Sequence, residues 1–264
     1  MKRIKFVFYI SLVLSLLFVS EVSARKKKKG IAEPYVKTEK LSDHIHIVSF
    51  YPEGINSLIV EFKDYFAILE SPITSENGEK LIGEAKKISQ EKPVKYFAFS
   101  HYHPENLRGI RPFVHKGATI LTLMENFDSI TYLVRNRKPF QVDSLHMQPK
   151  RLDIEIISDT KTVTDGEYTM QMYRIGNLYD GIEDDFTVFY FPDDKLLFEP
   201  KLIEMSKDGF LKKASEKELI IYDAIQNLDI EVDTIIRSWT PTDRNIKTII
   251  PFSELEETIF LRGN

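Results

Sequence analysis

The sequence predicts a mixed α/β domain, and three observations carry that prediction. After Gly30, short segments rich in β-branched and aromatic residues alternate with amphipathic helical segments. The order strand, helix, strand around Glu76–Gln90 favours a crossover unit and therefore a mixed sheet. With 42% hydrophobic and 29% charged residues among 264, the chain can build a large core and is too apolar to be disordered.

The first half of the domain begins with strands and continues with a helix. The expected strands are His44–Phe50, Ser57–Phe62 and Tyr65–Leu69, and Lys63-Asp64 is the turn between the last two. Apolar residues recur at helical spacing within Glu76–Gln90, so we expect an amphipathic helix that ends before Pro93. The uninterrupted apolar run Val94–Ser100 then predicts a buried strand.

The second half repeats the same alternation. Expected strands are Ala118–Thr122, Ile154–Ile157, Tyr168–Ile175, Phe186–Phe191, Lys195–Phe198 and Thr234–Arg237. Expected helices are Leu123–Arg137, Ser215–Leu228 and Ser253–Leu261. The sequence holds no internal repeat and no long linker after residue 40, so we expect one domain over residues 40–264.

The first residues of the chain predict export. Three basic residues within the first five positions precede the uncharged run Phe6–Ser20, and small residues lead up to Ala24. This is typical of a secretory signal peptide, residues 1–24, that is cleaved after Ala24. The mature protein is then periplasmic or secreted, with residues 25–39 as a basic leader. Because positive charge directly after the cleavage site resists translocation, an uncleaved membrane anchor is the alternative.

The basic leader and the overall charge limit the classes of partner. Arg25, Lys26, Lys27, Lys28 and Lys29 form either a solvated leader or a weak contact with an anionic membrane, worth about 1 kcal/mol per charge at most. The net charge of −4 argues against a nucleic-acid partner. The absence of cysteine excludes a disulfide scaffold, a thiolate metal site and a cysteine nucleophile.

The segment richest in chemical information is Ser100–Gly109, which reads SHYHPENLRG. His101 and His103 come just after the predicted strand Val94–Ser100, and ligands of α/β sheets bind at such strand ends. Two imidazoles at this spacing can face one point, and neutral imidazole is a good zinc ligand. The nearby carboxylate of Glu105 could complete or orient such a site.

This segment resembles the T-H-x-H-x-D-H-x-G-G motif of the metallo-β-lactamase fold superfamily, in particular its glyoxalase II-like metallo-hydrolases. Asn56–Val60 is similar to the family's N-S-x-x-V strand, and Ile68–Pro72 is similar to its L-I-D-x-P element. Phe191–Phe198 resembles the strand–turn–strand unit that follows. The resemblance covers about residues 40–250 and implies a four-layer αββα sandwich, with two mixed sheets face to face and helices outside.

The metal-ligand positions that the resemblance implies are largely changed. The third histidine of the family's first metal site aligns to Asn177. The four ligand positions of its second site hold Glu105, Asn106, Lys201 and Trp239. Only Glu105 keeps a usable ligand, and the ammonium of Lys201 repels a divalent cation. Glu70 aligns with a structural aspartate close to the metal, so it either supports a histidine or packs in the core.

These changes favour a non-catalytic binding or accessory protein without a cofactor. Its partner is then a small molecule or an envelope protein, with His101 and His103 as hydrogen-bonded pocket residues beside Trp239, which is either core or pocket mouth. The alternative is a hydrolase of a thioester, lactone or similar ester, with one zinc ion on His101, His103 and Glu105. A serine hydrolase is excluded because the sequence has no G-x-S-x-G motif.

The signal-peptide pattern predicts a mature N-terminus at Arg25. N-terminal sequencing of the protein from an exporting cell tests this. An intact Met1 in the membrane fraction would contradict cleavage and support the anchor.

Overall fold

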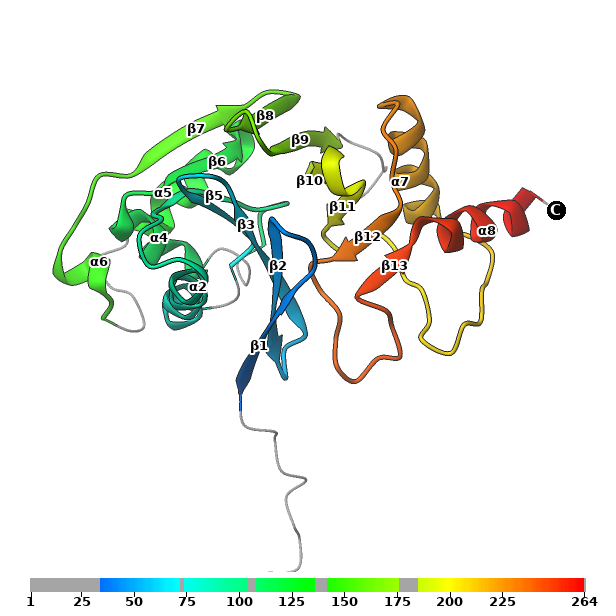
Figure 1. The fold of residues 1–264 in the computed structure, drawn as a ribbon, viewed down its shortest axis with the longest axis horizontal. Helices are drawn as coiled ribbons and strands as arrows, with labels where there is room; N and C mark the ends of the chain where they lie inside the picture. The colour runs from blue at the N-terminus through cyan, green and yellow to red at the C-terminus, as the bar shows by residue number, and fades with distance from the viewer. Residues whose placement is uncertain (1–33, 72–73, 104–107, 136–141, 176–184, 264) are drawn as a thin grey trace, which may run out of the picture. The chain divides into compact units, whose positions relative to one another are not determined.

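The structure, a computed structural model, describes residues 34–71, 74–103, 108–135, 142–175 and 185–263 (Figure 1). One compact unit spans Pro34–Asn264, so it begins before the boundary at residue 40 that the sequence suggests. Residues 1–33, with the expected signal peptide and most of the basic leader, lie outside the described residues. Within the described ranges, no helix has both the length and the apolar character needed to cross a membrane.

The first sheet contains seven strands in chain order. They are β1 (Tyr35–Lys40), β2 (Ile45–Tyr51), β3 (Ile55–Glu61), β4 (Phe66–Leu69), β5 (Val94–Ala98), β6 (Thr119–Leu123) and β7 (Asp153–Ile157). The first four strands pair antiparallel, and β4 to β7 pair parallel. Parallel neighbours need a crossover connection, and α2 (Ser75–Ile88) provides the one between β4 and β5. The predicted mixed sheet is therefore present.

The second sheet contains six strands in the order β13, β12, β11, β10, β9, β8. Their bounds are β8 (Thr160–Thr164), β9 (Thr169–Ile175), β10 (Phe186–Phe191), β11 (Leu196–Glu199), β12 (Thr234–Arg237) and β13 (Ile249–Pro251). β11 and β12 pair parallel, and the other pairs are antiparallel. The crossover between β11 and β12 contains α7 (Glu216–Asn227), which begins with a complete capping box of Ser215 and Glu218.

Helices cover the outer faces of both sheets (Figure 1). On the first sheet these are α2, α4 (Arg111–Lys116), α5 (Phe127–Arg135) and α6 (Ser144–Met147), and on the second they are α7 and α8 (Phe252–Gly263). Short 3-10 turns are η1 (Arg108–Ile110), η2 (Met124–Asn126) and η3 (Pro192–Asp194). The four layers confirm the αββα sandwich.

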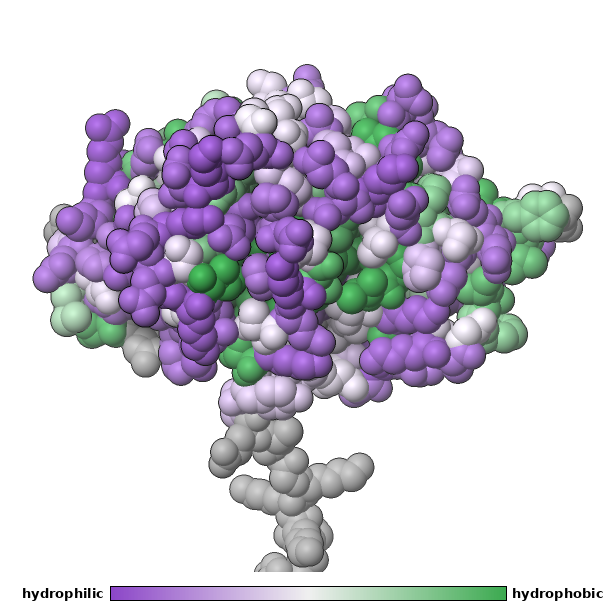
Figure 2. Space-filling model, viewed as in Figure 1, coloured by the Kyte–Doolittle hydropathy of each residue, from purple (hydrophilic) through white to green (hydrophobic). Residues whose placement is uncertain are grey.

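Three hydrophobic clusters fill the spaces between the layers. The central cluster lies between the sheets and contains fully buried aromatic side chains such as Phe189 and Phe198. Each such burial stabilises the fold by about 1.5–3 kcal/mol. Figure 2 shows a face that is mostly hydrophilic, with hydrophobic side chains in small groups.

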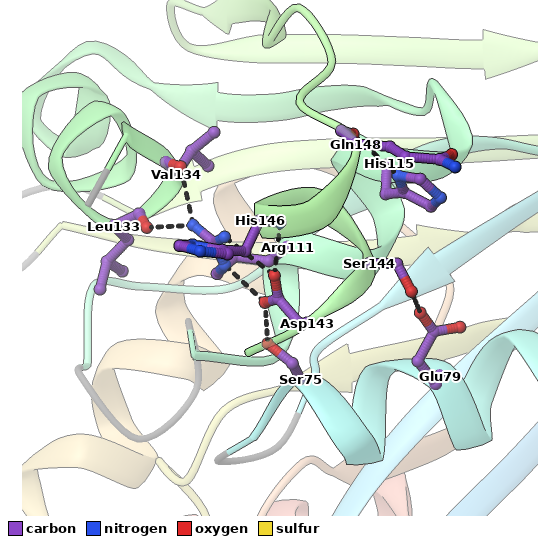
Figure 3. A network of polar contacts seen from close by, with 10 residues as sticks. All are labelled: Ser75, Glu79, Arg111, His115, Leu133, Val134, Asp143, Ser144, His146 and Gln148. Carbon is purple, nitrogen blue, oxygen red and sulfur yellow. Dashed lines mark hydrogen bonds and ion pairs between the residues drawn. The ribbon is translucent and has the colours of Figure 1, made fainter. Parts of the chain in front are cut away.

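A buried ion pair joins the helices of the first sheet (Figure 3). Arg111, in the first turn of α4, donates to both carboxylate oxygens of Asp143, with Nε–Oδ2 at 2.6 Å and Nη2–Oδ1 at 2.9 Å. Its Nη1 donates to the carbonyls of Leu133 and Val134 in the last turn of α5. Ser75 Oγ, at the start of α2, also donates to Asp143. One guanidinium thus positions α4 against α5 and, through Asp143, against α2 and α6.

We expect Asp143→Asn to lower the free energy of unfolding at pH 7 by about 3–5 kcal/mol, because it leaves the Arg111 guanidinium buried without its counter-charge. Burial raises the pKa of Asp143, but hydrogen bonds from Arg111, the His146 backbone and Ser75 outweigh it and lower the pKa to about 2. A depressed pKa stabilises the fold above the unfolded value, and this stabilisation is lost as the pH falls from about 4 to 2. Urea unfolding should therefore show the two proteins converging over that range.

Glu155→Gln is the matched control, because Glu155 pairs with Lys161 at the surface and such pairs contribute about 0–1 kcal/mol. Equal losses in Asp143→Asn and Glu155→Gln at pH 7 would contradict the structural role of the buried pair.

Candidate functional site

The candidate site lies where strands of both sheets end. Glu70 directly follows β4, and Ser100 and His101 lie just beyond β5 in the parallel part of the first sheet. Lys201 follows β11, and Trp239 follows β12, the parallel pair of the second sheet. The carboxyl ends of parallel strands meet at one edge of a sheet, so residues far apart in the sequence come together here.

His101 is buried and lines a cavity. Its Nδ1 lies 2.8 Å from Ser100 Oγ, while its Nε2 is buried without a hydrogen-bond partner among the described residues. Burial above all, together with the nearby charge of Lys201 and the ring of His103, lowers the pKa of the imidazole to about 3. His101 is therefore neutral at physiological pH. The ring centroids of His101 and His103 are 6.1 Å apart.

The buried side chain of Glu70 contacts the histidine segment through Ser100. Its Oε1 accepts a hydrogen bond of 2.9 Å from the backbone nitrogen of Ser100. Its Oε2 is buried without a hydrogen-bond partner among the described residues. Burial raises the pKa of Glu70 to about 7, although the hydrogen bonds from Ser100 act in the opposite direction. Glu70 also has a positive φ of 63°, which a non-glycine residue adopts at an energetic cost.

A cavity of about 80 Å³ opens beside the two imidazoles. It is lined by Ile55, His101, His103, Pro200, Lys201, Ser238 and Trp239. The Lys201 ammonium lies 5.7 Å from the centroid of the Trp239 ring, in cation–π range. The Trp239 side chain is 39% exposed, so it lies at the mouth of the cavity and not in the core.

A short backbone pairing between the two sheets holds Trp239 in place. Thr240 donates its backbone N–H to the Gly54 carbonyl at 2.6 Å, and Asn56 donates to the Ser238 carbonyl at 2.6 Å. The indole of Trp239 also donates to the Glu53 carbonyl at 3.3 Å. The approach is so close that a Cβ atom on Gly54 would lie 1.9 Å from the Thr240 carbonyl oxygen.

A second charged pair is buried behind the cavity. Arg237 is only 1% exposed, and its Nε lies 3.7 Å from Glu199 Oε1 on the neighbouring strand. Burial raises the pKa of Glu199 to about 7, against the lowering effect of Arg237. The Glu199 carboxylate also accepts a hydrogen bond from the backbone of Leu202 at 2.5 Å. This contact fixes the turn that carries Lys201.

The described residues of the site do not fit a divalent metal ion. Two imidazoles could serve as ligands, but Lys201 contributes an ammonium to the same cavity and Trp239 offers no ligand atom. An ammonium and a divalent ion repel each other by about 4 kcal/mol per unit charge at about 4 Å, with an effective dielectric constant of about 20. In the described ranges, no group of three or more His, Cys, Asp or Glu side chains could hold a metal.

The structure brings together four of the residues that the sequence singles out. His101, His103, Lys201 and Trp239 line one cavity, and Glu70 lies behind it through Ser100. Glu105, Asn106 and Asn177 lie outside the described residues.

Sequence reasoning missed three residues of the cavity wall and the charged pair behind it. Ile55, Pro200 and Ser238 line the cavity, and Ser238 donates its hydroxyl to the Pro200 carbonyl at 2.7 Å. A signal for the Glu199–Arg237 pair was present, because opposite charges end two adjacent apolar strands at the same register.

Gly54→Ala should destabilise the protein and shift the emission of Trp239, the only tryptophan in the chain. The methyl group would clash with Thr240 and force the two segments apart, in addition to about 1–3 kcal/mol of backbone strain at a φ of 71°. Urea unfolding and tryptophan fluorescence measure the two effects.

Gly117→Ala is the control, because Gly117 also has a positive φ but no atom within 4 Å of an added Cβ. If both alanine variants lose the same stability and keep the same emission, the close approach at Gly54 does not hold the cavity mouth.

Comparison with known proteins identifies the fold. No protein-family model matches the chain, and no curated protein matches its sequence. Solved structures do match over most of its length. A metallo-β-lactamase from Pontibacter korlensis is 20% identical with a TM-score of 0.59, over 87% of this chain and 100% of that one. A metallo-β-lactamase from Hirschia baltica is 14% identical with a TM-score of 0.58, over 86% and 97% of the two chains.

A third similar structure is the metallo-β-lactamase FIM-1 from Pseudomonas aeruginosa in its mono-zinc form. It is 15% identical with a TM-score of 0.57, over 86% of this chain and 95% of that one. At these identities the likeness concerns the arrangement of the chain and not its chemistry. The order of elements and the two sheets agree with it: this chain has the metallo-β-lactamase fold.

Proposed function

We propose that this protein is an exported, non-catalytic binding or accessory protein that uses the metallo-β-lactamase fold without its metals. Lys201 takes the role of an internal cation in the cavity where related proteins hold metal ions. The partner is a small molecule or a protein of the cell envelope that places a small group in the cavity beside Trp239.

The single observation that carries this proposal is the composition of the cavity wall. An ammonium and an indole lie beside the two imidazoles, at the positions that the resemblance assigns to metal ligands. The pKa of His101 is lowered to about 3 by its burial and then by Lys201, so the imidazole stays neutral and Lys201 supplies positive charge. Because the Lys201 side chain already supplies positive charge in the cavity, no bound metal ion is needed to supply it.

The size of the cavity limits what can enter it. Its volume of about 80 Å³ is well below the roughly 300–1,000 Å³ of typical small-molecule sites. Such a space accommodates a few water molecules or one small polar group. A partner would therefore place one protruding group in the cavity. The remainder of the partner could pack against the exposed face of the Trp239 ring.

One observation favours the alternative, a hydrolase of a thioester, lactone or similar ester with a single zinc ion. His101 Nε2 is buried, unpartnered among the described residues and held by a neutral ring, as a zinc ligand would be. The ligand set would be completed by His103 and by Glu105, which lies outside the described residues.

Metal content separates the two functions. We expect well under one equivalent of zinc per chain, by elemental analysis of the full chain purified without added metal, because Lys201 repels the ion. Two equivalents would overturn the proposal. One equivalent that disappears in His101→Ala would establish the mononuclear alternative instead.

Substitution of Lys201 tests whether its positive charge keeps metal ions out of the cavity. Lys201→Asp should bind added zinc more tightly than the unsubstituted protein, because it replaces a repelling charge with a ligand. Lys207→Asp makes the same change of charge at an exposed position and serves as the control. Zinc titrations that give equal affinities for the two variants would show that Lys201 does not govern the site.

A further inference from the structure

A second cavity, which shares no lining residue with the histidine cavity, is a basic groove on the helical side of the first sheet. It has a volume of about 790 Å³ and lies where α4, α5 and α6 meet the segment that leads into β7. We call it the basic groove. Its lining is Arg111, Val134, Arg135, Leu145, His146, Pro149, Lys150, Arg151 and Leu152.

The floor of the basic groove is fixed by the buried Arg111–Asp143 pair (Figure 3). Arg111 donates to Asp143 and to two carbonyls at the end of α5, while Asp143 also accepts from the His146 backbone at 2.9 Å. The groove therefore has a rigid base in which the charge of Arg111 is already balanced. A preorganised base lowers the entropic cost of binding a ligand.

The wall of the groove differs from its base, because the positively charged side chains on the wall have no ion-pair partner among the described residues. The side chains of Arg135, Lys150 and Arg151 are exposed, and none makes a hydrogen bond or ion pair with a residue that the structure describes. Two carboxylates nearby in the chain have other hydrogen-bond partners. Asp143 holds Arg111, and Asp153 accepts from Thr119 at 2.8 Å.

Surface cations elsewhere in this acidic protein commonly have a carboxylate partner, as Lys161 has Glu155 and Lys195 has Glu231. Three uncompensated cations around one groove therefore form a local positive field in a chain of net charge −4. Such a field attracts an anion of high charge density.

We propose that the basic groove binds a phosphate-bearing anion, held by Arg135, Lys150 and Arg151. Two guanidinium groups offer paired donors that match the geometry of phosphate oxygens, and the ammonium adds a point charge. The volume of about 790 Å³ suits a small-molecule ligand or a single lipid headgroup. Val134, Leu145 and Leu152 give an apolar surface for the uncharged part. This inference is independent of the function proposed for the histidine cavity.

Inorganic pyrophosphate is the probe for the shared chemistry, titrated by calorimetry into the full chain at low ionic strength. We expect saturable binding by the unsubstituted protein. The triple variant Arg135→Ala/Lys150→Ala/Arg151→Ala should bind at least about tenfold more weakly, because each lost charge-assisted hydrogen bond weakens binding by that order. All three side chains are exposed, so circular dichroism should show an unchanged fold.

The matched control is Lys207→Ala/Lys212→Ala/Lys213→Ala, which removes the same charge from exposed lysines between β11 and α7. It should bind pyrophosphate like the unsubstituted protein. Vesicles of phosphatidylcholine with and without phosphatidic acid identify the source: binding that requires phosphatidic acid and is lost in the groove variant points to a lipid headgroup. Binding of pyrophosphate without binding to either vesicle points to a soluble phosphorylated molecule.

Three outcomes would overturn the proposal. These are a groove variant that keeps the affinity of the unsubstituted protein, a control variant that loses as much as the groove variant, and a protein that binds neither pyrophosphate nor vesicles containing phosphatidic acid.

Discussion

The pairing of Gly54–Asn56 with Ser238–Thr240 is the constraint on which the histidine cavity depends. It joins the start of β3 in one sheet to the chain just after β12 in the other, through short backbone hydrogen bonds. The Asn56 side chain strengthens the junction, since it donates to the Arg237 carbonyl at 3.0 Å and accepts from Ser49 at 2.7 Å. Buried amides of this kind must be paired, so the register between the sheets is fixed at the site. The sandwich interior sets the distance between the sheets, but this junction decides which side chains face one another.

Charged residues lie in two layers at the site, one at the cavity wall and one behind it. At the cavity wall, Lys201 lies near two imidazoles and over the Trp239 ring. Behind it, Arg237 Nε faces Glu199 Oε1 at 3.7 Å, a distance at which the pair is electrostatic and not hydrogen-bonded. Buried ion pairs contribute little net stability, yet the loss of one partner is strongly destabilising. Both members of the Arg237–Glu199 pair are therefore needed at the strand ends behind the cavity.

Elements with strong apolar patterns were predictable from sequence, and those stabilised by their neighbours were not. The prediction for β10 has the bounds of the structure, because Phe186–Phe191 is apolar on both faces. β8 and β1 were missed, since TKTVT and YVKTEK carry polar residues and form strands only by pairing with β9 and β2. α4 was missed because six residues are too few to show a helical period.

The same distinction holds for the two sites. The histidine spacing and the family resemblance pointed to His101, His103, Lys201 and Trp239, which line one cavity, but not to the rest of its wall. The Arg111–Asp143 pair, 32 residues apart, and the groove above it depend on how short helices pack. No local pattern in the sequence specifies that packing.

The edges of the two sheets have a consequence for how copies of this chain meet. β13 is only three residues long and ends in Pro251, and β1 carries Lys37, Glu39 and Lys40 along an exposed edge. At the other side, β7 and β8 follow one another directly in the chain, and Lys161 pairs with Glu155 across them. Short or charged edges resist the addition of a strand from a second molecule. The edge strands of the two described sheets are thus poorly suited to accept a strand from a second copy of this chain.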